Sequence, residues 1–136
     1  EVSAAEWKAR GAAHFRARRF REALACYTEA LDSEMAGGYS SGRALSSVLY
    51  ANRSACHLEL GEDDAALLDA GRAVQMDRGN RKAFFRKGKA FLSMGRLNDA
   101  LDALLHARTL AEEAGEARDA GLCRLIEECE RRLPSS

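Results

Sequence analysis

The feature that most constrains the fold of this sequence is an internal repeat of small residues. Three pairs of positions are each separated by 34 residues, namely Ser54 and Gly88, Ala66 and Ala100, and Ala73 and Ala107. A constant spacing of this size is typical of a chain built from stacked copies of one supersecondary unit. Small side chains let two helix backbones approach closely, so the expected unit is a pair of packed helices.

An earlier copy of the same pattern is followed by extra residues. Three pairs are each separated by 43 residues, namely Gly11 and Ser54, Ala23 and Ala66, and Ala30 and Ala73. The nine additional residues fall between 35 and 43, where three glycines and two serines predict a loop. An insertion is tolerated there because the entropy of loop closure grows only logarithmically with loop length.

The composition and the local signals predict that these units are helical. Ala, Leu, Arg and Glu dominate the chain, and its one proline is Pro134. Ser3 followed by Glu6 predicts a capping box that starts a helix near Ala4, and Gly61 is placed to end a later helix. We expect a single all-α domain over residues 1–136. Its predicted parts are repeat units at about 4–34, 44–77 and 80–114, a loop at 35–43 and a capping helix at about 116–133.

The charge balance argues against several classes of partner. The chain has 21 basic and 21 acidic residues, so it has no overall field that would attract nucleic acid or an anionic membrane. No apolar run reaches the length of a membrane span, and the N-terminus lacks the pattern of a signal peptide. The chain begins at Glu1 without methionine, and we expect it to be one domain of a longer protein.

The sequence also lacks the residue patterns that are typical of metal sites and catalytic sites. The four cysteines show no CxxC pairing and are expected to be reduced core residues of a cytoplasmic protein; they are Cys26, Cys56, Cys123 and Cys129. The histidines His14, His57 and His106 show no paired spacing of metal ligands. Because stacked helix pairs form no deep cleft, we expect no metal site, no cofactor and no enzymatic activity.

Cations nevertheless gather in one stretch of the chain. Between Arg78 and Lys89 there are six cations and no acid. Lys82 and Arg86 are four residues apart, so on a helix they project from one face and could hold an anion between them. An anionic peptide is therefore the expected partner. A second basic cluster, at residues 16–21, is expected to be solvated surface, with an RNA or nuclear-import contact as the alternative.

The repeated positions resemble those of the tetratricopeptide repeat family. The positions that follow the family pattern are Trp7, Gly11, Ala23, Tyr27 and Ala30 in the first unit and Gly88, Phe91, Ala100 and Ala107 in the third. Two positions depart from it, since Ala70 replaces a usual aromatic residue and Arg78 stands where a proline often closes the unit. The resemblance implies three helix-turn-helix repeats and a capping helix in a right-handed α-solenoid. The first helix of each pair would line its concave face.

The strings WKARG, YANRSA and KAFFRKGKA resemble the members of this family that bind chaperones through a two-carboxylate clamp. The resemblance implies that the C-terminal Glu-Glu-Val-Asp tail of a 70- or 90-kDa heat-shock chaperone is held by Lys8, Asn52, Lys82 and Arg86. One clamp position differs, because Ala12 replaces an asparagine and cannot donate a hydrogen bond. Such a charge-assisted bond is worth about 1.5–3 kcal/mol, so weaker peptide binding is expected. The remaining predicted groove-lining residues are Ala12, Ala55, Phe85 and Lys89.

The leading hypothesis is a monomeric, cytoplasmic co-chaperone-like adaptor that binds a chaperone tail and has no nucleic-acid or membrane partner. Two alternatives stay open. The first is a scaffold for a different acidic or internal peptide, with Ala12 marking a groove that has diverged from chaperone tails. The second is the targeting module of a larger enzyme, such as a prolyl isomerase or a methyltransferase.

Overall fold

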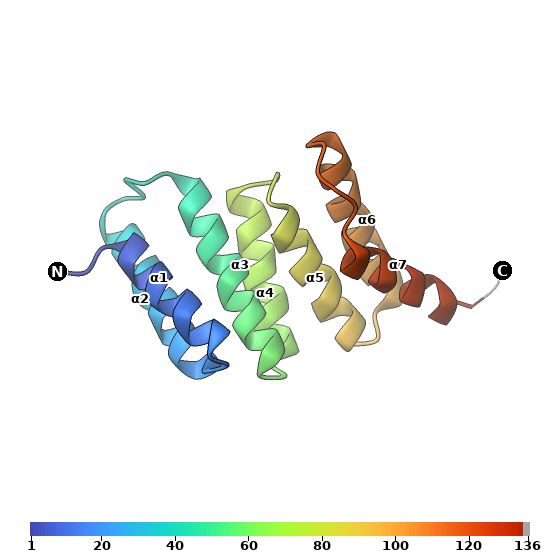
Figure 1. Cartoon of the computed structure of the whole chain (residues 1–136), viewed down its shortest axis with the longest axis horizontal. Helices are drawn as coiled ribbons and strands as arrows, with labels where there is room; N and C mark the ends of the chain where they lie inside the picture. Colours follow the sequence, from blue (N-terminus) through green and yellow to red (C-terminus); the bar gives the residue numbers. More distant parts are fainter. Residues whose placement is uncertain (135–136) are drawn as a thin grey trace.

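The structure is a computed structural model that describes residues 1–134, and in this part of the chain it has seven α-helices and no strand. The helices are α1 (Ala4–Arg16), α2 (Phe20–Ala36), α3 (Arg43–Glu59), α4 (Asp63–Met76), α5 (Arg81–Ser93), α6 (Leu97–Glu113) and α7 (Ala120–Arg132). They lie side by side in chain order between the two termini (Figure 1). The predicted all-α class is confirmed.

The helices pack as a row of antiparallel pairs. α1 packs on α2, α3 on α4 and α5 on α6, and the second helix of each pair packs on the first helix of the next. In addition, α3 contacts α5, and α5 contacts α7. Contacts confined to neighbouring units are characteristic of a helical solenoid. The predicted architecture of stacked helix pairs is thus confirmed.

The repeated small residues lie where the two helices of a pair touch. A Cβ atom on Gly88 of α5 would be 2.6 Å from Cγ of Leu104 in α6. A Cβ atom on Gly11 of α1 would likewise be 2.6 Å from Cε1 of Tyr27 in α2. At the equivalent position of the middle pair, the buried Ser54 hydroxyl donates a 2.7 Å hydrogen bond to the Ala66 carbonyl. A small side chain is needed at each position because the helices approach so closely.

Local signals explain where several helices begin and end. The amide of Glu6 donates to Ser3 Oγ at 3.1 Å and the amide of Ser3 donates to Glu6 Oε1 at 3.2 Å, which is the predicted capping box. Gly61 has a φ of 74°, the left-handed conformation expected of a residue that follows a helix. No helix in the described part of the chain is both long and apolar enough to cross a membrane.

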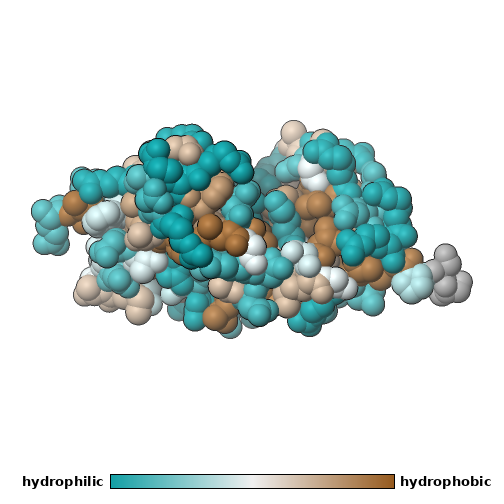
Figure 2. Space-filling model, turned by 90° about the horizontal axis from the view of Figure 1, so that it is seen from below, coloured by the Kyte–Doolittle hydropathy of each residue, from teal (hydrophilic) through white to brown (hydrophobic). Residues whose placement is uncertain are grey.

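The last helix begins later than the sequence suggests. α7 starts at Ala120 rather than at about residue 116, because the carboxylate of Asp119 accepts a 3.1 Å hydrogen bond from the Leu122 amide and caps the helix there. Its buried residues pack on α5 and α6 and close that end of the core; they are Leu122, Ile126 and Cys129. The face shown in Figure 2 is mostly hydrophilic, and its outline is indented between the two ends of the molecule.

Candidate functional site

The predicted clamp residues lie on the first helices of the three pairs. Lys8 is on α1, Asn52 is on α3, and Lys82 and Arg86 are on α5. Lys82 is exposed, and the other three are half-buried. Within residues 1–134, none of the four forms a salt bridge or a side-chain hydrogen bond with another residue. Their polar groups are therefore available to a ligand.

Arg86 has the most unusual surroundings of the four. Burial lowers the pKa of its guanidinium, while the carboxylate of Glu59 acts in the opposite direction. The thiol of Cys56 on α3 is also close enough to interact with it, and burial raises the pKa of that thiol to about 12. A partly desolvated guanidinium without a paired carboxylate attracts an incoming anion more strongly than a fully hydrated one does.

The predicted groove-lining residues differ in their surroundings. Ala12 is half-buried on α1, and Ala55 is buried on α3. Phe85 on α5 lies beneath two cations, with Arg86 Cζ 5.4 Å and Lys89 Nζ 5.6 Å from its ring centre. Cations at this distance from an aromatic ring are attracted to its face. Phe85 therefore helps to position the two cations on α5.

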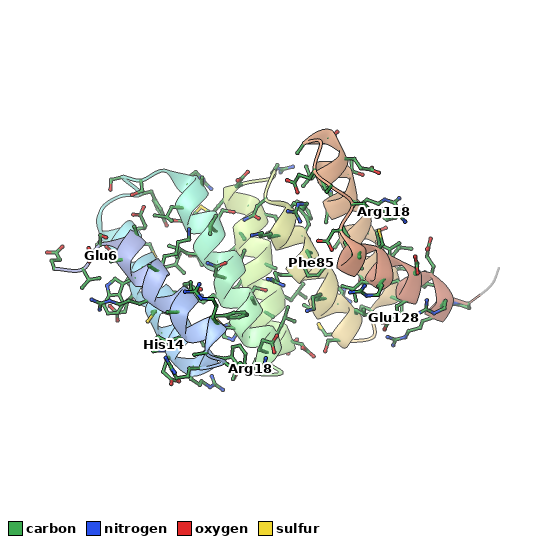
Figure 3. The ribbon with its side chains drawn as sticks, viewed as in Figure 1. Glu6, His14, Arg18, Phe85, Arg118 and Glu128 are labelled. Carbon is green, nitrogen blue, oxygen red and sulfur yellow. The ribbon has the colours of Figure 1, made fainter. Side chains whose placement is uncertain are left out.

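Helix α7 also contributes to this region, which could not be foreseen from the family resemblance. Phe85 and Lys89 line a pocket of about 530 Å³ whose other wall is formed by α7 residues, including Leu125 and Glu128. Phe85 and Glu128 are labelled on these two helices in Figure 3. A capping helix was expected in this part of the chain, but a role for its charged residues in this region was not. The helical spacing of Gly121, Leu125 and Glu128 places them on one side of α7 and could have predicted this contact face.

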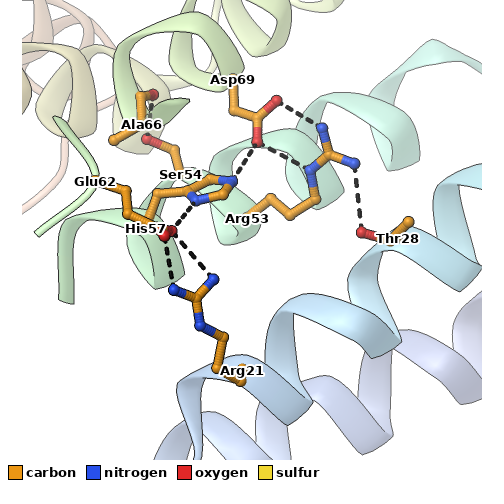
Figure 4. Close-up of polar contacts among 8 residues, drawn as sticks. All are labelled: Arg21, Thr28, Arg53, Ser54, His57, Glu62, Ala66 and Asp69. Atoms are coloured by element: carbon orange, nitrogen blue, oxygen red, sulfur yellow. Dashed lines mark hydrogen bonds and ion pairs between the residues drawn. The ribbon is translucent and has the colours of Figure 1, made fainter. Parts of the chain in front are cut away.

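A polar network holds the middle of the solenoid in place. Arg53, next to Asn52 on α3, donates two hydrogen bonds of 2.9 and 2.8 Å to the Asp69 carboxylate on α4 (Figure 4). His57 Nε2 lies 3.5 Å from the same carboxylate, and its Nδ1 lies 2.9 Å from Glu62. Because these bonds link α3 to α4, they fix the rotation of α3 and with it the direction in which Asn52 projects.

Asp69 and Arg21 form the charged links of this network. Asp69 is only 1% exposed, and its carboxylate pairs with the guanidinium groups of Arg53 and Arg72 while His57 Nε2 lies nearby. Arg21 is exposed, as expected of the second basic cluster, and it also bonds to Glu62 at 2.7 Å and extends the network to α2. The members of the pairs Arg53–Asp69 and Arg21–Glu62 are far apart in sequence, so these pairings could not be deduced from local spacing.

The cysteines are unpaired in the described part of the chain, as expected. Three of them are buried, whereas Cys123 is half-buried and its sulfur accepts a 3.1 Å hydrogen bond from Arg118 Nε. Among residues 1–134, no group of three or more His, Cys, Asp and Glu side chains could hold a metal ion.

Comparison with known proteins finds relatives that are much longer than this chain. No protein-family model matches it. It is 31% identical over 103 residues to protein unc-45 homolog B of Xenopus tropicalis, which is 76% of this chain and 10% of that protein. It is 31% identical over 104 residues to the Hsp70/Hsp90 co-chaperone CNS1 of Saccharomyces cerevisiae, 76% of this chain and 26% of that protein. The chain thus spans between a tenth and about a quarter of the length of these relatives.

Several solved structures share the whole arrangement of helices. The TPR2B domain of yeast Sti1, in complex with an Hsp70 peptide, superposes with a TM-score of 0.84 at 23% identity, covering 96% of this chain and 98% of that one. The first TPR of Spaghetti (RPAP3), bound to the HSP90 peptide SRMEEVD, gives a TM-score of 0.82 at 22% identity, with 95% and 94% covered. The similarity extends over nearly the whole of both chains in each case.

Proposed function

Since this chain has the tetratricopeptide repeat fold, as its sequence resemblance predicts, we propose that it is a non-catalytic adaptor for the acidic C-terminal tail of a heat-shock chaperone of the 70- or 90-kDa class. The observation that carries the proposal is the set of unpaired polar groups on the first helices. Arg21 and Arg53, by contrast, are paired with carboxylates on neighbouring elements. A ligand with several carboxylates would supply the missing partners.

The chemistry of such a tail suits these groups. A C-terminal aspartate carries two carboxylates a few ångströms apart, and several donors from different helices are needed to bind both. Lys8 and Lys82 would supply flexible ammonium donors, and Asn52 would supply a directional amide. Arg86 would form paired hydrogen bonds with one carboxylate from a partly desolvated position. We expect modest affinity, because Ala12 adds no donor and a short peptide loses conformational freedom on binding.

The ligands bound in the similar solved structures support this proposal. The Spaghetti domain is bound to a peptide that ends in Glu-Glu-Val-Asp, and the Sti1 domain is bound to an Hsp70 peptide. CNS1, one of the matched relatives, is named as a co-chaperone of both chaperone classes. We propose that this chain acts similarly, as a monomer in the cytosol.

The test is a fluorescence-anisotropy titration with labelled chaperone tails as free acids and as C-terminal amides. We expect Lys82→Ala and Arg86→Ala to weaken binding of the free acid at least about tenfold, because each removes a charge-assisted contact. Lys87→Ala is the matched control, since Lys87 is also a cation of α5 and is half-buried like Arg86, but it lines pockets with residues of α4 and α6. Ala12→Asn should strengthen binding. Equal affinity for the acid and the amide would exclude the clamp.

Two other functions can be distinguished from this one. A scaffold for an internal acidic segment would bind the amidated peptide as well as the free acid. A targeting role within a larger enzyme is favoured by one relative, since the rice serine/threonine-protein kinase BSK1-2 matches 83% of this chain over 22% of its own length. The remaining sequence of the parent protein would decide that question.

A further inference from the structure

The loop that lengthens the first repeat covers a pocket at the N-terminal end of the molecule, far from the cations of α5. The pocket has a volume of about 890 Å³, and its walls are the start of α1, the end of α2, the loop after α2 and the start of α3. These segments meet at the upper left of Figure 1. The loop, at 37–42, is longer than the corresponding connection at 77–80 in the second repeat, and its residues Gly37, Ser40 and Ser41 form part of the pocket wall.

The pocket is acidic although the chain as a whole is neutral. Its wall includes Glu1 and, from α2, Glu29, Asp32 and Glu34, and none of its described lining side chains is basic. Within residues 1–134, none of the three α2 carboxylates has an ion-pair or side-chain hydrogen-bond partner. Several carboxylates on the walls of one pocket, without counter-ions, favour the binding of a cation.

Among these carboxylates, Glu34 gives the strongest indication that the pocket binds a ligand. Its side chain is among the buried polar groups, with 4% of the residue exposed, and its Oε2 has no hydrogen-bond partner. Buried polar atoms of folded proteins nearly always have a partner, because leaving a carboxylate oxygen unsatisfied is strongly unfavourable. Since Glu34 lines an open pocket, the missing donor can come from a molecule that enters it.

The shape of the pocket favours an organic cation over a metal ion. No group of three or more His, Cys, Asp and Glu in the described part of the chain could hold a metal ion, so the carboxylates of this pocket do not form a metal site together. Trp7 and Leu45 form an apolar part of the wall. A side chain with an aliphatic stem and a broad cationic head meets both requirements. A guanidinium has five donors in a planar fork and forms paired bonds with carboxylates.

We propose that this pocket binds an arginine side chain of a partner polypeptide, with the guanidinium at Glu34 and the stem against Trp7 and Leu45. None of the predicted clamp residues lines this pocket, and its charge is opposite to theirs. The pocket and the chaperone-tail groove could be occupied together, so the domain could join an acidic tail to a second, basic partner. The proposal does not depend on tail binding.

The test is an NMR titration of the ¹⁵N-labelled protein with the blocked peptide acetyl-Gly-Arg-Gly-amide. Trp7 is the one tryptophan in the sequence, so its indole signal reports on the pocket without overlap. We expect saturable shifts of this signal and of the amides of residues 32–41. The same peptide with citrulline should cause none, because citrulline keeps the shape of arginine without its charge, and the lysine peptide should bind more weakly.

Glu34→Gln should weaken binding of the arginine peptide at least about tenfold, because it removes the charged acceptor. Glu113→Gln is the control, since Glu113 is exposed on α6 and outside the pocket. Should Glu34→Gln fail to fold, the double variant Glu29→Gln/Asp32→Asn changes only exposed residues and should weaken binding roughly threefold.

Three results would overturn the proposal. They are equal shifts with the citrulline peptide, unchanged affinity in both the Glu34 variant and the double variant, and tighter binding of lysine than of arginine. Chaperone-tail affinity should stay the same in these variants. Loss of the arginine site and loss of the tail site are therefore distinguishable.

Discussion

Two helical glycines show how the surroundings of a residue decide the effect of the same substitution. A Cβ atom on Gly88 would meet Cγ and Cδ2 of Leu104, both at 2.6 Å, and Leu104 is itself completely buried. A Cβ atom on Gly71, in α4, would have no such neighbour within 4 Å. Both positions are inside helices, where alanine is intrinsically preferred to glycine by about 1 kcal/mol.

We therefore expect opposite effects on the free energy of unfolding. Gly71→Ala should raise it by up to about 1 kcal/mol, through helix propensity alone. Gly88→Ala should lower it by about 1 kcal/mol and Gly88→Val by up to about 3 kcal/mol, because Leu104 cannot move aside without disturbing the core. Urea denaturation of the three variants measures this. An increase in stability for Gly88→Ala would show that α5 and α6 are not packed too closely at Gly88 to accept a methyl group.

Between elements, the network around Asp69 joins three helices through directional hydrogen bonds. Arg53 bonds to Asp69 on α4 and, at 3.4 Å, to Thr28 on α2 (Figure 4). The hydrogen bond to Asp69 raises the pKa of Arg53, the direction expected for a cation stabilised by its partner. Removing one member of such a buried pair leaves the other charge without compensation.

Asp69→Ala is accordingly expected to destabilise the protein by about 3 kcal/mol or more. Asp99→Ala is the matched control, because Asp99 bonds to Arg96 at 2.8 Å but both side chains are about half exposed. Exposed pairs contribute little, so this variant should lose less than about 1 kcal/mol. Thermal unfolding of both variants at one pH compares them. Equal losses would mean that burial of the Asp69 pair has no energetic consequence.

For the whole molecule, the balance of charge makes alkaline pH more informative than neutral pH in measurements of stability. The formal net charge is zero at pH 7, so repulsion between like charges is small there. Burial raises the pKa of Tyr27 and that of Cys56 to about 12, from ordinary values of 10.0 and 9.0. Both residues belong to the core formed by the first pair and α3. Their neutral forms are needed in the folded protein.

The free energy of unfolding should therefore fall as the pH rises from about 9 to about 12. In this range the unfolded chain releases both protons while the folded chain retains them, and by linkage the unfolded state is favoured. Below pH 9 both groups are protonated in either state, so this contribution is fully present. Melting temperatures at several alkaline pH values test it, with Cys56→Ala expected to show a shallower decline. Identical slopes would exclude Cys56 as a cause.

What could be predicted from the sequence rests on local interactions and on repetition. The capping box at Ser3, the left-handed conformation of Gly61 and the small residues at Gly88 depend on neighbours within one helix pair, and the 34-residue spacing repeats that information. The common face of Lys82 and Arg86 follows in the same way from helix geometry. The amino-acid sequence by itself therefore determined the helices and their pairing, whereas the candidate clamp came from the family resemblance and stays a prediction.

Only the tertiary structure decided which charged groups lose contact with water. Asp69 and Glu34 are both acidic residues on second helices, yet one is bonded to Arg53 and the other has an oxygen without a partner. Of the residues that bond to Asp69, Arg72 is three positions away, but Arg53, which donates two hydrogen bonds, is 16 positions away on another helix. The reason is physical: burial and charge pairing depend on side chains brought together from different repeats and from the inserted loop, and a sequence pattern contains no distances between them.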